Sequence, residues 1–193
     1  MGMSTPFRSR IWLCVSSLAG LLLAALVVPL QAAGPGPGVS PRIPGFGPVF
    51  PVAHPVAMPQ ASGEYKILMD LTRAEPGYDQ LNRGLELAAR LANLLGLAGV
   101  PAAQVHLAVV AHDQALDALL NDATYRSIHG IGNPNAALLQ ALHRAGVELL
   151  VCGQTMAHRH IEASQLAPHV HTALSALTTV ILYQQRGYVV LAP

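Results

Sequence analysis

One cysteine has the surroundings that sulfur chemistry requires. Cys152 ends the apolar segment 147–151 and is followed by Gly153 and polar residues that can begin a helix. A helix N-terminus stabilises a thiolate because partial positive charge lies beside the sulfur, and a glycine lets the backbone approach closely. The pattern fits a reactive thiol able to hold a persulfide. It also fits a buried cysteine that acts as a small apolar residue.

Two polar residues end other apolar segments. Asp70 lies at the end of segment 65–71, and His112 closes segment 104–111. In a parallel sheet the carboxyl ends of the strands share one edge, where ligands and chemistry are usually found. We therefore expect Asp70, His112 and Cys152 to converge. His112 could donate a proton or raise the thiolate fraction of Cys152, or it could simply cap the next helix.

Three side-chain amides are further candidates for a binding pocket. Gln154 follows the cysteine closely, and Asn133 and Asn135 flank Pro134. All three could hold a sulfur ligand through their amide groups. The Asn133-Pro134 pair also has a purely structural explanation, with Asn133 as N-cap and Pro134 as the first helical residue.

The histidine pairs 158/160 and 169/171 suggest a metal site. Residues two apart on a helix point in different directions, so 169 and 171, at the start of an expected helix, cannot face one ion. The sequence contains no Cys-x-x-Cys motif and no histidines four residues apart, and we expect neither metal nor cofactor. It also lacks a P-loop, a dinucleotide-binding glycine motif and a Gly-x-Ser-x-Gly motif.

The first 32 residues have the layout of a secretory signal peptide. Arg8 and Arg10 precede the apolar run 11–30, and Ala32 and Ala33 offer a cleavage site. A retained transmembrane anchor is the alternative reading. Cleavage predicts a periplasmic or secreted protein, with no membrane segment and Cys152 as its only thiol. That single thiol excludes a dithiol mechanism. The net charge of the mature chain would be −1, which does not favour binding to nucleic acid.

The remaining chain divides into a linker and one domain. Residues 33–63 are rich in proline and glycine and are expected to be extended or disordered. Residues 64–193 are long enough for one domain with a real core. Apolar patterns predict strands at 65–71, 104–111, 147–152 and 188–191. Helical patterns cover 79–96, 133–146 and 168–186, the last with Val170, Leu174, Leu177 and Ile181 on one side, and residues 113–127 are predicted to form one or two short helices.

Alternating strands and helices predict an α/β fold, with three α/β/α layers and a mainly parallel central sheet. Several segments in order resemble the exported branch of the DsrE/DsrF-like sulfur-relay family: 65–72, 89–93, 109–112, 133–135, 151–154 and 174–177. The resemblance covers essentially all of 64–193. It implies a homo-oligomer, such as a trimer or hexamer, and a cysteine that carries sulfur as a persulfide in some members.

The family's cysteine maps onto Cys152 and its strand-end histidine onto His112. Exported relatives usually have glycine where this chain has Asp113, and a small-basic-Gly segment where it has His158-Arg159-His160. The resemblance implies at most a sulfur carrier or sulfurtransferase-type accessory protein, with a protein or a small sulfur species as donor or acceptor. The alternatives are a non-catalytic ligand-binding or assembly module and a metal-binding protein.

Overall fold

The computed structural model describes residues 1–2 and 37–193, and the unit considered below is Gly34–Pro193. The predicted signal peptide lies almost entirely outside the described residues. Within them, no helix is both long enough and apolar enough to cross a membrane.

A five-stranded parallel sheet forms the centre of the domain, in the order β4-β3-β2-β1-β5. The strands are β1 (Tyr65–Leu71), β2 (Val105–Ala111), β3 (Glu148–Cys152), β4 (Val170–Ala173) and β5 (Val189–Leu191). The apolar runs of β1, β2 and β3 suit strands that are covered on both faces. The predicted α/β class with a mainly parallel sheet is confirmed.

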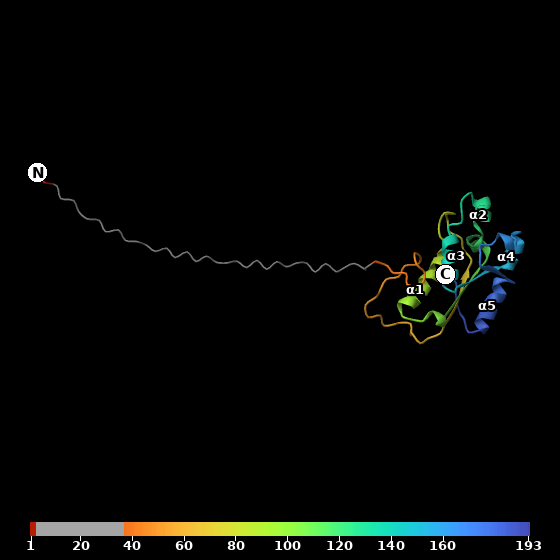
Figure 1. The fold of residues 1–193 in the computed structure, drawn as a ribbon, viewed down its shortest axis with the longest axis horizontal. Coiled ribbons are helices and arrows are strands. Elements are labelled where there is room, and N and C mark those ends of the chain that lie inside the picture. Colours follow the sequence, from red (N-terminus) through yellow and green to blue (C-terminus); the bar gives the residue numbers. More distant parts are fainter. Residues whose placement is uncertain (3–36) are drawn as a thin grey trace. The chain divides into compact units, whose positions relative to one another are not determined.

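Helices cover both faces of the sheet (Figure 1). The α-helices are α1 (Arg83–Leu97), α2 (Asp122–His129), α3 (Ala136–Arg144), α4 (Gly153–His158) and α5 (Ala176–Gln185). Short 3₁₀ turns are η1 (Ala102–Gln104), η2 (Asp113–Leu119) and η3 (Ala163–Gln165). The larger core lies between the sheet and α1 and α3. On the opposite face a smaller core lies under α5 and includes Cys152.

Local sequence signals set where α1 begins. The Asn82 side chain accepts a hydrogen bond from the Leu85 N–H, so Asn82 is the N-cap and the helix begins at Arg83 rather than at 79. The segment 113–127, predicted to form one or two short helices, forms η2 and α2, and the second begins after a similar cap at Asn121.

The predicted helix 168–186 is wrong in its first half. Residues Val170–Ala173 form β4, which pairs in parallel with β3 from Leu149 to Cys152. Pairing with the open edge of β3 favours strand over helix, and β-branched Val170 and Thr172 fit a strand well. His169 has a φ of 68°, which interrupts any helix there. The helix begins only after Ser175, whose side chain accepts from the Thr178 N–H.

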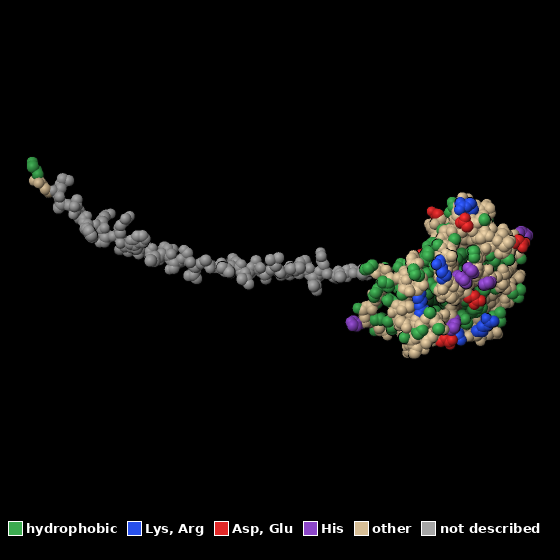
Figure 2. Space-filling view, viewed as in Figure 1, with side chains coloured by type: hydrophobic (Ala, Val, Ile, Leu, Met, Phe, Trp, Pro, Cys, Tyr) green, Lys and Arg blue, Asp and Glu red, His purple; other side chains and the backbone are tan. Residues whose placement is uncertain are grey.

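The later start of α5 changes which of its residues face the sheet. Ala176, Thr179 and Tyr183 are buried, whereas Leu177 on α5 is 79% exposed and Leu174, in the turn before the helix, is 74% exposed. The outer face of α5 is therefore apolar. Charged side chains elsewhere are few and of mixed sign on the face shown in Figure 2.

Part of the expected linker is packed on the domain. Ile43 and Val49 are buried, and Ile43 belongs to the core beside α1. Backbone hydrogen bonds between Val39 and Val49 close this segment into a loop. We name residues Val39–Val49 the strap. It differs from the spacer expected for these residues because α1 supplies it with both apolar and polar partners.

Candidate functional site

The three strand-end residues lie on the face of the sheet that α5 covers. Leu68, Val110 and Leu150 belong to that core, and Asp70, His112 and Cys152 each follow two residues later along their strands. The β2–β3 pairing reaches Ala111 and Val151, so His112 and Cys152 are the next residues of adjacent strands. The topology therefore brings all three to one edge.

Cys152 lies where two helices begin. It is the N-cap residue of α4, so it lies beside the first turn of that helix. Strand pairing places it opposite Ala173, just before α5 begins at Ala176. The side chain is 5% exposed. The thiol is thus surrounded by backbone N–H groups rather than by solvent.

Two opposing effects act on the Cys152 thiol. Burial raises its pKa because the charged form is poorly solvated. Hydrogen bonds to the thiolate from the Thr155 N–H, the Ala176 N–H, the Thr155 hydroxyl and the Gln154 N–H lower it. The donors outweigh burial, so the pKa lies below its ordinary value. This environment favours the nucleophilic form of the sulfur.

His112 interacts with carboxylates. Its Nε2 lies 3.0 Å from Asp70 Oδ1, and its Nδ1 lies 3.3 Å from Asp113 Oδ2. The side chains of His112 and Asp70 are about four-fifths buried. Both ring nitrogens are therefore held in place, and the imidazole is fixed beside the strand end. The donors that lower the pKa of Cys152 come instead from α4 and α5.

Two departures from the family pattern share one backbone feature. Asp113 has a φ of 49° and His160 a φ of 55°, both in the left-handed region. Glycine adopts this region without strain, which explains its expected presence at both positions. Aspartate tolerates the region better than most residues. The Asp113 N–H, presented by this conformation, donates to Thr155 Oγ1 at 3.4 Å.

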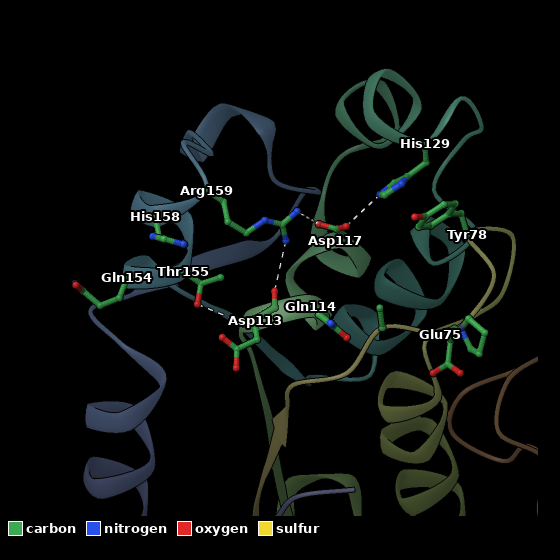
Figure 3. Close-up of a pocket in the computed structure, with 12 residues that line it drawn as sticks. Glu75, Tyr78, Asp113, Gln114, Asp117, His129, Gln154, Thr155, His158 and Arg159 are labelled. Atoms are coloured by element: carbon green, nitrogen blue, oxygen red, sulfur yellow. Dashed lines mark hydrogen bonds and ion pairs between the residues drawn. The ribbon is translucent and has the colours of Figure 1, made fainter.

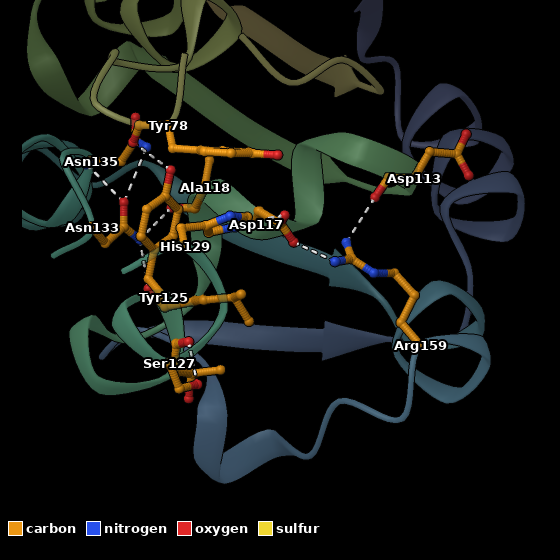
Figure 4. Close-up of polar contacts among 12 residues, drawn as sticks. Tyr78, Asp113, Asp117, Ala118, Tyr125, Ser127, His129, Asn133, Asn135 and Arg159 are labelled. Atoms are coloured by element: carbon orange, nitrogen blue, oxygen red, sulfur yellow. Dashed lines mark hydrogen bonds and ion pairs between the residues drawn. The ribbon is translucent and has the colours of Figure 1, made fainter. Parts of the chain in front are cut away.

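The asparagines hold loops together. Asn133 Nδ2 donates to the carbonyls of Ala118 and Leu120, and its Oδ1 accepts from the Asn135 N–H. Asn135 Oδ1 in turn accepts from the Asn82 N–H at 2.7 Å. Asn135, rather than Asn133, is the N-cap of α3. Both asparagines are buried, and their amides bind neighbouring backbone and each other, with Asn135 Nδ2 donating to Asn133 Oδ1 (Figure 4).

A cavity of about 650 Å³ opens at the same edge of the sheet. Figure 3 shows that its walls come from the loop after β1, from η2, from α2 and from α4. Gln154 and Thr155 line it, and hydrogen bonds from the same two residues lower the pKa of the Cys152 thiol. Gln154 Nε2 also donates to the Leu174 carbonyl, so this exposed side chain bridges α4 and the β4–α5 turn.

A partly buried ion cluster lines the cavity. Asp117 receives Arg159 Nη2 at 2.6 Å and His129 Nε2 at 3.1 Å (Figure 4). Arg159 also donates to the Asp113 carbonyl, which fixes α4 against η2. Tyr78 stacks on His129. Sequence reasoning missed Asp117, His129 and Thr155, because they lie on three separate elements with no common motif.

The histidine pairs do not converge. His169 stacks on His143, with ring centroids 3.7 Å apart, and His160 lies in a left-handed turn. Within residues 37–193, no three histidine, cysteine or acidic side chains are grouped so that they could hold a metal ion.

Comparisons with known proteins agree with this fold. The sequence pattern described as the DsrE/DsrF-like family matches residues 66–193. The protein of unknown function MTH1491 from Methanobacterium thermoautotrophicum has a similar structure, with a TM-score of 0.52 and 18% identity over 67% of this chain and 100% of that chain. The ychN protein from E. coli gives a TM-score of 0.49 and 20% identity over 67% of this chain and 99% of that chain. No curated protein matches. At 18% identity, the likeness to MTH1491 concerns the fold alone.

Proposed function

Because the chain belongs to the DsrE/DsrF-like family, we propose that it binds or relays sulfane sulfur as a persulfide on Cys152. The observation that carries the proposal is the set of donors around the sulfur. Backbone N–H groups from the first turns of α4 and α5 hold the thiol pKa down. The same fixed donors suit the anionic end of a persulfide, since they need no rearrangement to stabilise charge.

The transfer step is a thiolate displacement. With thiosulfate as donor, the Cys152 thiolate attacks the outer sulfur and the bond to the sulfonate sulfur breaks. Sulfite leaves with the bonding electron pair, so the step requires no oxidant or reductant. With polysulfide, the leaving group is a polysulfide shorter by one sulfur atom. A persulfide on another protein could serve in the same way.

The neighbouring residues have supporting roles. Thr155 donates from both its N–H and its hydroxyl, and Gln154 donates from its N–H. His112 is held by Asp70 and Asp113 at the adjacent strand end, where it fixes the loop that leads into η2. Asn133 and Asn135 shape the loops behind this edge.

Mass spectrometry tests the proposal. The purified protein is incubated with polysulfide or thiosulfate, and Cys152 is examined for added sulfur, with Cys152→Ser as the control. A gain of one or more sulfur atoms confined to Cys152 supports sulfur carriage. An unmodified Cys152 that a thiol probe still labels fully would refute it.

A second function is favoured by one observation. Cys152 is 5% exposed and is not among the residues that line the large cavity. The protein would then be a ligand-binding or assembly module with a structural cysteine. A thiol that reacts only after denaturation favours this function, whereas one that reacts in the native protein favours sulfur carriage.

Self-association fits the outer face of α5. Leu174, Leu177, Ile181 and Leu182 are exposed there, and such a contiguous apolar surface usually marks an interface. Because the patch is nearly uncharged, two copies can meet without like-charge repulsion. We expect Leu177→Asp to lower the mass measured by light scattering. An unchanged mass would exclude this face as the interface.

Export is part of the same proposal, supported by the basic residues and apolar run before residue 33. N-terminal sequencing of the protein recovered from a cell-envelope fraction tests it. A mature end near Ala33 is expected, and an intact Met1 in the cytosolic fraction would contradict it.

A further inference from the structure

The strap is held by one fully engaged amide. Asn93 lies on α1 and its side chain is 0% exposed. Asn93 Oδ1 accepts from the Arg42 and Ile43 N–H groups, each at 2.9 Å. Asn93 Nδ2 donates to the Phe46 and Gly47 carbonyls, also at 2.9 Å. The amide therefore binds the strap backbone on both of its polar sides.

Apolar and steric contacts add shape selectivity. The Ile43 side chain is completely buried in the core beside α1. Gly47 has a φ of 52°, and a Cβ there would clash with the backbone of Arg90 and Ala89 on α1. The Arg42 guanidinium donates to the Val100 carbonyl beyond the helix. The strap thus has an apolar anchor, a close backbone approach and a charged donor, which together define one bound conformation.

The residues that follow the strap are different. All of residues 51–58 are exposed, and Val56 is 107% exposed. This proline-rich loop connects the strap to β1 but has no comparable packing. The loop that connects the strap covalently to β1 is therefore separate from the strap residues that contact α1.

We propose that the outer face of α1 is a peptide-binding surface whose ligand is the chain's own strap. Its recognition elements are the Asn93 amide for the peptide backbone and the apolar core residues that bury Ile43. The strap lies outside the residues 66–193 that match the family, so this is a property of this chain beyond sulfur chemistry.

Nicking the loop tests the proposal in the full chain. Residues 53–57 are replaced by a recognition sequence for a site-specific protease, and the folded protein is cut. We expect the N-terminal fragment to co-elute with the domain on native size exclusion. Asn93→Ala and Ile43→Asp should release the fragment at least about tenfold faster, because buried hydrogen bonds or an apolar anchor are lost.

Val52→Asp is the matched control, since it introduces the same charge at an exposed position of the N-terminal fragment. A fragment that leaves the unsubstituted nicked protein as fast as the Ile43→Asp protein would overturn the proposal. Amide hydrogen exchange in the uncut, unsubstituted chain tests the same contacts without depending on whether a variant folds. The Arg42 and Ile43 N–H groups should exchange at least about a hundredfold more slowly than in an unstructured peptide. Exchange at the unstructured rate would also overturn it.

Discussion

Replacing Thr155 with valine tests how the thiol of Cys152 is activated. Valine keeps the shape of threonine and retains the backbone N–H, but it removes the hydroxyl, one of the four donors that act on the thiolate. A hydrogen bond to a charged group is worth about 1.5–3 kcal/mol, and part of that remains for the neutral thiol. Since one pKa unit corresponds to about 1.4 kcal/mol, we expect the pKa of Cys152 to rise by about one unit.

The assay is the rate of alkylation of Cys152 by iodoacetamide as a function of pH, in native protein. The midpoint gives the pKa, and at pH values below it the rate should fall by up to about tenfold in Thr155→Val. Thr155→Ser is the matched control because it keeps the hydroxyl, and its midpoint should stay near that of the unsubstituted protein. An unchanged midpoint in folded Thr155→Val protein would refute the role given to the hydroxyl.

Three further outcomes follow from the same geometry. The difference in the free energy of unfolding between the unsubstituted protein and Cys152→Ser should grow as pH rises to the ordinary thiol pKa of 9.0, because the thiolate is stabilised only in the folded state, and it should be lost as pH falls through the lowered pKa of Cys152. Urea titrations at several pH values measure this difference, and a difference that does not change with pH would contradict the pKa shift. Gly153→Ala should destabilise the fold by about 1–3 kcal/mol, because its Cβ would lie 2.7 Å from the Ala173 carbonyl oxygen; an unchanged urea midpoint would show that this contact relaxes easily. His160→Gly should raise the melting temperature, because relief of the left-handed backbone at φ 55° contributes about 1 kcal/mol, and a lower melting temperature would show that the histidine side chain stabilises the turn.

The sequence predicts the central strands well because their apolar runs are a local signal. β1 has the predicted bounds, and β2 and β3 differ from prediction by one residue at their starts. The edge strand β4 is different, since pairing with β3 decides its conformation and local helical spacing gives no sign of that partner. Because β4 was predicted as helix, the start of α5 was also not predicted, and this helix start supplies the Ala176 N–H to the sulfur.

Long-range polar contacts explain what else sequence reasoning could not predict. Proline and glycine in the strap indicate an irregular backbone, but Asn93, which binds it, lies about fifty residues away. Asn133 and Asn135 were candidates for ligand binding, and the structure uses their amides on nearby backbone. The Asp117 cluster has no signal in the sequence because its partners are distributed over η2, α2 and α4.

The pKa of Cys152 in the native, unsubstituted protein tests the central claim most directly. The donors from α4 and α5 predict a midpoint below the ordinary thiol value of 9.0, measured by alkylation or thiolate absorbance without denaturant. A midpoint at or above that value, or a thiol that reacts only after unfolding, would contradict the proposal that this site is built for sulfur chemistry.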